Sequence, residues 1–333
     1  MKKYNVGIVG IRGAVGQEML KILKERKFPV DQLRCFSTSL DKDTEIDGLL
    51  YEVLNKDNAA EKFSNVQIGL FSPGASVSKV IAPIAAEAGC VVIDNTSQFR
   101  MDEDVPLVVP EVNPEDIDKH KGIIANPNCS TIQMVVTLKP LHNFSKIKRI
   151  VVSTYQSVSG AGAPAIKELE DQSKDRSVPP NKFPYPIAFN LIPQIDVAMD
   201  NFYTKEEIKM VNETKKIMHD NSIRITATCV RVPTFRAHSE SVNVETEQKI
   251  SREKALELLN AADGITVIDD LVNAKYPLPL DAEGCDDTFV GRIREDISND
   301  NTLDLWIVSD NLRKGAALNA VQIAEKLIEK ELV

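Results

Sequence analysis

The first 130 residues alternate short apolar runs with segments in which apolar side chains recur at helical spacing. The apolar runs occupy residues 4–10, 33–38, 66–72, 90–96, 106–112 and 122–128. The helical segments occupy residues 15–28 and 77–89. Strands that alternate with helices in this order predict an α/β fold with a mostly parallel, doubly wound sheet of the Rossmann type.

The rest of the chain has longer strand-like segments with fewer helices between them. These segments occupy residues 147–160, 222–233, 239–247, 288–296 and 302–311. We expect 222–233 and 239–247 to form a consecutive pair of strands, since the second alternates polar and apolar side chains. Helical spacing recurs at 251–262 and 314–333. We expect the polar stretch 171–186 to be an excursion of the chain away from this domain. Together these features predict an α+β domain of largely antiparallel strands, covered by helices on one face.

Composition and charge exclude several classes of partner. Of the 333 residues, 43% are hydrophobic, and the formal net charge is -9 with a sequence pI of about 5.2. An acidic chain without basic runs is a poor ligand for nucleic acid or an anionic membrane, so we expect neither. The N-terminal stretch does not resemble a signal peptide, and no apolar run is long enough to span a membrane, which predicts a cytoplasmic protein.

Five cysteines are widely spaced, and none belongs to a CxxC pair. Such an odd, scattered set predicts free thiols, without a disulfide framework or a zinc site, and we expect no metal. Cys35, Cys90 and Cys229 lie in apolar, strand-like surroundings and are expected in the core.

A glycine-rich turn joins the first strand to the first helix. Its sequence, GIRGAVG, places Gly10, Gly13 and Gly16 between the two elements. Glycines in this context allow close approach of a pyrophosphate to the helix N-terminus, which predicts dinucleotide binding; the alternative is a plain tight turn. Ser37, Thr38 and Ser39 follow the second strand where an NAD site usually has an acid.

Hydroxyl groups without a carboxylate tolerate a 2′-phosphate, so the serine and threonine residues favour NADP. No arginine stands beside them in the sequence, however, and Asp41 and Asp43 are close by.

Cys129 has neighbours unlike those of the other cysteines. It stands in NPNCSTIQM, between helix-capping residues and an apolar helical run, which predicts a position at a helix N-terminus. The partial positive charge there stabilises a thiolate, and free backbone N–H groups could hold an oxyanion. The alternative is an inert thiol at a domain crossing. A nucleophilic cysteine beside a nicotinamide cofactor indicates aldehyde oxidation through a thioester, with His238 as the candidate acid/base.

Several long motifs together resemble the bacterial aspartate-semialdehyde dehydrogenases. They are DNTSQFRMDEDVPLVVPEVN, NPNCSTIQM, STYQSVSGAG, ATCVRVP…HSESV, DTFVGRIR and WIVSDNLRKGAA, in that family's order. The resemblance implies reversible reduction of L-aspartyl 4-phosphate by NADPH to L-aspartate 4-semialdehyde, on the way to lysine, methionine and threonine. It also implies a glyceraldehyde-3-phosphate-dehydrogenase-like fold. Residues 1–129 with 313–333 would bind the dinucleotide, and residues 130–312 would carry the substrate-binding and dimerisation domain of a homodimer or dimer of dimers.

The resemblance also assigns roles to individual residues. Cys129 matches the nucleophile, His238 the acid/base that manages the thiohemiacetal proton, and Gln156 the residue that orients the intermediate. Arg231 matches the ligand of the substrate α-carboxylate. The phosphate site and the ammonium site would be formed by Arg100, Lys209 and Glu206, with Glu207 as an alternative to Glu206. The cofactor would contact Gly10, Arg12, Gly13, Ala14, Val15, Gly16, Ser37, Thr38, Ser39, Gly160, Gly162 and Asn311.

Three other readings stay open. An N-acetylglutamyl-phosphate reductase shares the chemistry, but its substrate has a blocked amine and needs no acid for an ammonium group. A glyceraldehyde-3-phosphate dehydrogenase has a different sequence around its cysteine. A non-catalytic dinucleotide sensor would not need Cys129, Gln156 and His238 together.

Overall fold

The computed structural model describes residues 2–333 and divides into two compact units. The first contains the residues up to Pro127 together with Ala316–Val333, and the second is Asn128–Gly315. The sequence-based limits differ from this division by two or three residues at each boundary. The C-terminal segment belongs to the first unit, as the sequence predicts. Among the described residues, no helix has both the length and the apolar character that crossing a membrane requires.

The first unit is built on a seven-stranded sheet of order β3-β4-β2-β1-β5-β6-β7. Its strands are β1 (Tyr4–Val9), β2 (Val30–Ser37), β3 (Thr44–Ile46), β4 (Leu49–Val53), β5 (Ile68–Phe71), β6 (Val91–Asp94) and β7 (Ile123–Ala125). All pairs are parallel except β3 and β4, which form an edge hairpin. Asp47 and Gly48 connect them with positive φ angles of 50° and 75°, the conformation that suits an Asp-Gly turn.

The expected strand at 106–112 is wrong. Only an isolated bridge between Leu107 and Ala125 forms there, because the segment runs into the turn before the 3-10 helix Pro114–Lys119.

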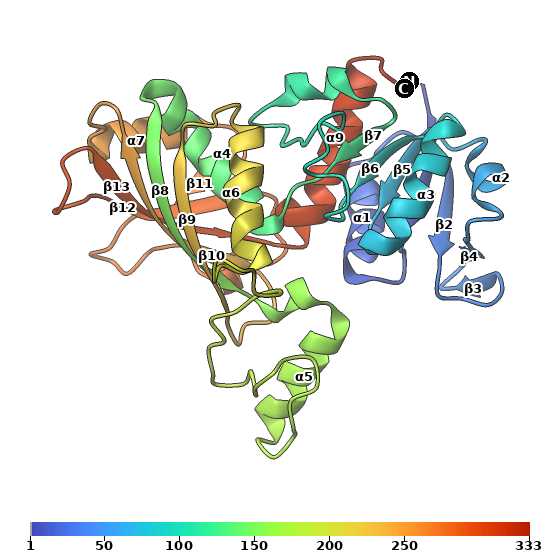
Figure 1. Cartoon of the computed structure of the whole chain (residues 1–333), viewed down its shortest axis with the longest axis horizontal. Coiled ribbons are helices and arrows are strands. Elements are labelled where there is room, and N and C mark those ends of the chain that lie inside the picture. Colours follow the sequence, from blue (N-terminus) through green and yellow to red (C-terminus); the bar gives the residue numbers. More distant parts are fainter. Residues whose placement is uncertain (1) are drawn as a thin grey trace. The chain divides into compact units, whose positions relative to one another are not determined.

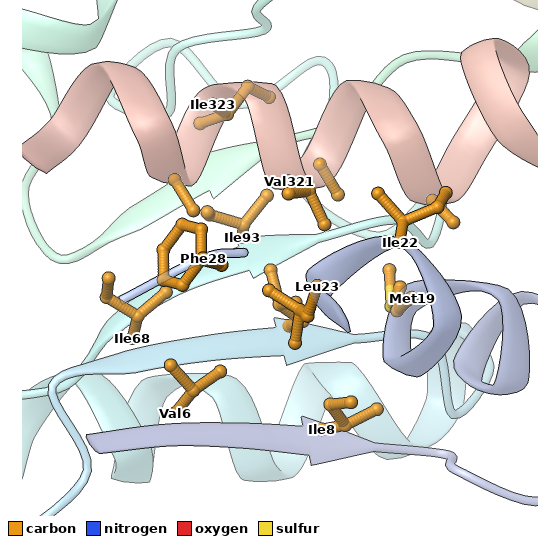
Figure 2. Packing of buried hydrophobic residues seen from close by; sticks show 14 of the residues in the cluster. Val6, Ile8, Met19, Ile22, Leu23, Phe28, Ile68, Ile93, Val321 and Ile323 are labelled. Atoms are coloured by element: carbon orange, nitrogen blue, oxygen red, sulfur yellow. The ribbon is translucent and has the colours of Figure 1, made fainter. Parts of the chain in front are cut away.

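Helices cover both faces of this sheet, as a doubly wound fold requires. They are α1 (Ala14–Glu25), α2 (Ala59–Phe63), α3 (Ala75–Glu87) and α9 (Leu318–Glu329). Side chains alternate along the strands, so Val6 and Ile8 of β1 pack with α1 and α9, whereas Val9 packs on the other face with α2 and α3. Figure 2 shows Val321 of α9 and Ile22 of α1 on the side of their helices that faces this first cluster.

The second unit is built on a six-stranded sheet of order β11-β12-β13-β10-β8-β9. Its strands are β8 (Ile147–Gln156), β9 (Arg224–Arg231), β10 (His238–Thr246), β11 (Ile265–Val267), β12 (Thr288–Glu295) and β13 (Thr302–Ser309). The predicted pairing of 222–233 with 239–247 is wrong. Strand β8 lies between them, parallel to β9 and antiparallel to β10.

Helices pack on this sheet and cap its ends. They are α4 (Cys129–Phe144), α5 (Ala163–Lys174), α6 (Lys205–Ile217), α7 (Arg252–Asn260) and α8 (Pro279–Ala282), with a 3-10 turn at Val158–Ala161 and a π-helical turn at Arg313–Ala317. Helix α4 packs against α6, α7, β8 and β10. Helix α5 stands apart from the sheet with a small apolar cluster of its own, so the predicted excursion exists and begins earlier in the chain (Figure 1).

Replacement of Ile323 by alanine tests whether the C-terminal helix belongs to the first core. Ile323 is fully buried, so Ile323→Ala should lower the free energy of unfolding by about 2–5 kcal/mol through lost burial and a cavity. Urea unfolding of the variant should show this loss. Ile297→Ala is the matched control, because Ile297 is fully exposed and its replacement should change little. Equal stability of the two variants would contradict this packing.

Candidate active site

Three polar side chains form a row at one end of the neighbouring strands β9, β8 and β10 of the second sheet. Gln156 at the end of β8 pairs with Arg231 of β9, and the pairing of Tyr155 with Ser239 places His238 of β10 on the other side of Gln156. All three residues are buried. Adjacent strands lie about 4.8 Å apart, so strand pairing itself fixes the spacing of these groups.

A second row lies two residues further along the same strands. Thr154 pairs with Cys229 on one side and with Glu240 on the other. Gln156 donates from Nε2 to Thr154 Oγ1 at 3.2 Å, which links the two rows. Glu240 is completely buried, and burial raises the pKa of its carboxyl well above the ordinary value despite a contact with Gln133. Burial thus favours the protonated, uncharged form of this carboxyl over the carboxylate.

Cys129 is the first residue of α4, as the sequence predicts. Asn128 caps this helix, and its Oδ1 accepts from the backbone N–H groups of Ser130 at 3.0 Å and Thr131 at 3.3 Å. The cap already occupies these two N–H groups, so they are not free to hold an oxyanion, and a role for another N–H group at the start of α4 stays a prediction.

The exposure of Cys129 distinguishes it from the three predicted core cysteines. Cys129 is half-buried, whereas Cys35, Cys90 and Cys229 are buried. Burial raises the pKa of all three core thiols, that of Cys35 to about 11, so their thiolates are scarce at neutral pH.

Two glutamates of α6 hold the first turn of α4. Asn128 donates from Nδ2 to Glu206 Oε1 at 2.7 Å, and its backbone N–H donates to Glu213 Oε2 at 2.6 Å. Sequence reasoning named Glu206 but missed the part that Glu213 plays. The signal was present, because residues seven apart on a helix lie on one face.

Glu206 connects the nucleophile helix to the polar row and to a lysine. Gln156 donates to its Oε1 at 3.4 Å, and Lys209 lies 3.0 Å from its Oε2. Lys209 also contacts Asp196 at 2.9 Å. Burial lowers the pKa of Lys209, but the two carboxylates outweigh burial and raise it, so the ammonium group is charged. Asp196 is a further member of the site that sequence reasoning missed.

Glu207 has a different task from its neighbour. Its Oε2 accepts from the backbone N–H of Thr204 at 2.7 Å in a capping box, and its Oε1 accepts from that of Cys229 at 3.0 Å. Both carboxylate oxygens of Glu207 therefore accept hydrogen bonds from backbone N–H groups, which leaves Glu206 as the acid that faces the polar row.

Two glycines approach these groups so closely that a side chain would not fit easily. A Cβ added to Gly315 would lie 2.8 Å from Cys129 Cβ. A Cβ added to Gly160 would lie 3.1 Å from Arg231 Nη1 and 3.2 Å from His238 Nε2. Asn311 lies close by, since its Oδ1 accepts from Ala237 N at 3.0 Å.

The turn between Gln156 and α5 contains the remaining predicted residue of this unit. Gly162 is the N-cap of α5 with a positive φ of 89°. Gly160, Gly162 and Asn311 thus lie in or beside the turn that follows Gln156, and their assignment to the cofactor stays a prediction.

The glycine turn of the first unit has the geometry of a pyrophosphate site. Gly10 has a φ of +83°, and an added Cβ would lie 2.6 Å from the Ser72 carbonyl oxygen. Gly13 is the N-cap of α1, so the backbone N–H groups of Ala14, Val15 and Gly16 open the helix. The first N–H groups of a helix have no intrahelical acceptor, which makes this turn a fitting site for a dinucleotide pyrophosphate.

An arginine stands beside the serines after β2, although none is near them in the sequence. Arg12 comes from the glycine turn and donates from Nη1 to Ser39 Oγ at 2.9 Å. Ser39 Oγ lies 3.3 Å from Ser37 Oγ, and Thr38 and Ser39 are exposed. Hydroxyl groups and a guanidinium together suit a phosphate.

Arg100 lies in the first unit, after β6. Its Nη2 donates to the Asn95 carbonyl oxygen at 2.9 Å, and its charge acts on the buried Asp94. Burial raises the pKa of Asp94, while hydrogen bonds from Thr96 and Ser78 and the charge of Arg100 oppose this rise.

Each of the two units matches a known protein family. Residues 5–120 match the family described as semialdehyde dehydrogenase, NAD binding domain, and residues 138–314 match semialdehyde dehydrogenase, dimerisation domain. The aspartate-semialdehyde dehydrogenase of Aquifex aeolicus is 55% identical over 341 residues, which cover 99% of each chain.

Solved structures of aspartate-semialdehyde dehydrogenases also match the whole chain. Aspartate semialdehyde dehydrogenase II from Vibrio cholerae, complexed with ASA, matches with a TM-score of 0.92 and 51% identity over 99% of each chain. The enzyme from Candida albicans with NADP matches with a TM-score of 0.78 and 26% identity over 100% of each chain. The fold predicted from the sequence is thus confirmed, and the chain belongs to the aspartate-semialdehyde dehydrogenase family.

Proposed function

We propose that this protein reversibly converts L-aspartyl 4-phosphate to L-aspartate 4-semialdehyde and phosphate with NADPH. The observation that carries the proposal is the half-exposed Cys129 at the start of α4, in the same unit as the buried row of Arg231, Gln156 and His238. A helix N-terminus favours the nucleophilic thiolate form of a thiol, and the relatives named above are aspartate-semialdehyde dehydrogenases.

The chemistry assigned to the chain is acyl transfer at sulfur. The Cys129 thiolate attacks the acyl phosphate carbon, phosphate leaves, and a thioester remains on the cysteine. NADPH, when bound, supplies the hydride that converts the thioester to a thiohemiacetal. We assign to Gln156 the orientation of the acyl group through its neutral amide, and to His238 the acid/base role for the thiohemiacetal proton. Collapse of the thiohemiacetal then releases the aldehyde and regenerates the thiolate.

Charged residues recognise the ends of the amino acid. Arg231 is buried, and its Nε has no hydrogen-bond partner among the described residues. We therefore assign this guanidinium N–H to the substrate α-carboxylate. We assign the substrate ammonium to Glu206, because Glu207 already serves two backbone groups. Lys209 and Arg100 are assigned to the phosphate from the resemblance of their motifs.

Preference for NADP is proposed from the contact between Arg12 and Ser39. We assign the guanidinium to the 2′-phosphate, with hydroxyl groups from Ser37, Thr38 and Ser39 beside it. We also propose a homodimer formed through the second unit, which matches a dimerisation domain, with a dimer of dimers as an alternative. A cytoplasmic location stays a prediction.

Removal of the nucleophile should abolish turnover. Cys129→Ala should reduce phosphate-dependent reduction of NADP⁺ by aspartate semialdehyde by about a thousandfold or more, because no thioester can form. The assay follows reduced cofactor at saturating phosphate, with Cys285→Ala as the control because Cys285 is also partly exposed. A wild type that uses N-acetylglutamate semialdehyde instead would reassign the substrate.

Replacement of Arg12 tests the cofactor preference. Arg12→Ala should raise the KM for NADP⁺ by about tenfold or more and leave the KM for NAD⁺ nearly unchanged, since a charged hydrogen bond is lost for one cofactor only. Steady-state kinetics with both cofactors measures the difference. Lys42→Ala is the control, because Lys42 is an exposed cation near the same serines in the sequence. Equal weakening of both cofactors would mean that Arg12 only supports the turn.

The two adjacent glutamates should respond differently to the same substitution. Glu206→Gln should raise the KM for aspartate semialdehyde by about tenfold, because the ammonium loses its charged partner. Glu207→Gln should mainly lower thermal stability, because that side chain caps α6. Kinetics and thermal unfolding on both variants provide the comparison. The reverse pattern would assign the ammonium to Glu207.

A further inference from the structure

Lys209 lies between two carboxylates that come from different parts of the chain. Its Nζ is 3.0 Å from Glu206 Oε2, one turn earlier in α6, and 2.9 Å from Asp196 Oδ2, in the segment before α6. A lysine ammonium has three N–H donors in one compact group. The two carboxylates therefore take two donors and fix the direction of the third, which has no acceptor within residues 2–333.

The two carboxylates differ in how many groups they serve. Glu206 Oε1 also accepts from Asn128 Nδ2 at 2.7 Å and from Gln156 Nε2 at 3.4 Å, so Glu206 is shared among several groups of the site. Within the described part of the chain, Lys209 is the only side chain to which Asp196 is hydrogen-bonded. A change at Asp196 therefore acts on Lys209 without disturbing the other site residues directly.

The local backbone determines the direction of the Asp196 carboxylate. Asp196 has a positive φ of 69°, a conformation that Asp and Asn adopt more readily than most other residues with a side chain. Its Oδ1 accepts from the backbone N–H of Val197 at 2.9 Å, and Gln194 Nε2 donates to its carbonyl oxygen at 3.3 Å. One carboxylate oxygen thus stabilises the turn, while the other contacts Lys209.

The segment that carries Asp196 is hydrogen-bonded to β9 on one side and to the start of α6 on the other. Ile192 and Arg231 exchange two backbone hydrogen bonds, of 3.0 Å from Ile192 N and 2.9 Å from Arg231 N. On the other side of Asp196, the Val197 carbonyl oxygen accepts from Lys205 N at 2.9 Å. The backbone thus holds Asp196 in place relative to both the strand and the helix.

Asp196 and Lys209 are both charged at neutral pH. Burial raises the pKa of Asp196, but the contacts with Lys209 and with the Val197 N–H outweigh burial and lower it. Burial lowers the pKa of Lys209, but Glu206 and Asp196 outweigh burial and raise it. The negative charge of Asp196 by itself repels a phosphate anion. Any benefit of Asp196 to a phosphate site must therefore come from the position that it gives to Lys209.

We propose that Asp196 is a positioning residue of the phosphate site, which directs the third N–H group of Lys209 toward the phosphate. The proposal rests on the function proposed above, in which Lys209 binds phosphate, and it adds a residue to that site. Asp196 acts through Lys209 and does not contact the substrate. Phosphate is a substrate in the direction of aldehyde oxidation, so loss of this positioning should appear in the KM for phosphate.

Asp196→Asn separates the roles of the two carboxylate oxygens. Asparagine adopts the left-handed conformation readily, and its Oδ1 can keep the contact with the Val197 N–H. Its Nδ2 then faces Lys209, and an amide NH₂ group cannot accept from an ammonium. Steady-state kinetics at saturating NADP⁺ should show a rise of about threefold to tenfold in the KM for inorganic phosphate. The KM for aspartate semialdehyde should stay nearly unchanged.

Three outcomes would overturn the proposal. A lower KM for phosphate would mean that Asp196 acts through its negative charge, which the substitution removes. An unchanged KM for phosphate would mean that Lys209 needs no support from Asp196. An equal rise in the KM of both substrates, with a lower thermal stability, would mean that Asp196 only supports the fold. Asp200→Asn is the matched control, because it removes an exposed carboxylate from the same segment and should change neither KM.

A double-mutant cycle tests whether Asp196 acts through Lys209. Lys209→Met should itself raise the KM for phosphate, and in that background Asp196→Asn should have almost no further effect, because the group that it positions is absent. Additive effects of the two substitutions would overturn the proposal. A wild type without phosphate-dependent turnover would count against the proposed function, whereas a cycle without coupling in an active enzyme would count only against this inference.

Discussion

The position of β8 between β9 and β10 is the constraint on which the site depends. Because β8 pairs with both strands, Arg231, Gln156 and His238 become neighbours although they are far apart in the sequence. Backbone hydrogen bonds fix this spacing more firmly than side-chain contacts could, since a shift of one residue would turn every side chain to the other face. The row is therefore organised before any substrate arrives.

Buried carboxylates connect this row to the nucleophile. Glu206 and Glu213 of α6 both bind Asn128, so the start of α4 is held by two charge-assisted hydrogen bonds. Buried charges are costly unless they are paired, and Lys209 supplies the pairing for Glu206.

Local chemistry was readable from the sequence, and long-range contacts were not. The cap at Asn128, the position of Cys129 and the glycine turn follow from neighbouring residues, and the structure contains all three. The placement of β8 between β9 and β10 depends on pairing that no local pattern encodes. The contact of Arg12 with Ser39 likewise joins two separate loops, which is why the sequence alone suggested a missing arginine.

The separate apolar cluster around α5 has a consequence for how such proteins diversify. The segment between β8 and α6 packs largely on itself, through Leu169, Ile187 and Ile192 among others. Loop closure costs little more for a longer segment, so changes in length away from Ile192, which pairs with Arg231 of β9, would leave the strand pairing intact. The part of this segment around α5 can therefore change in length over generations while the paired strands stay the same.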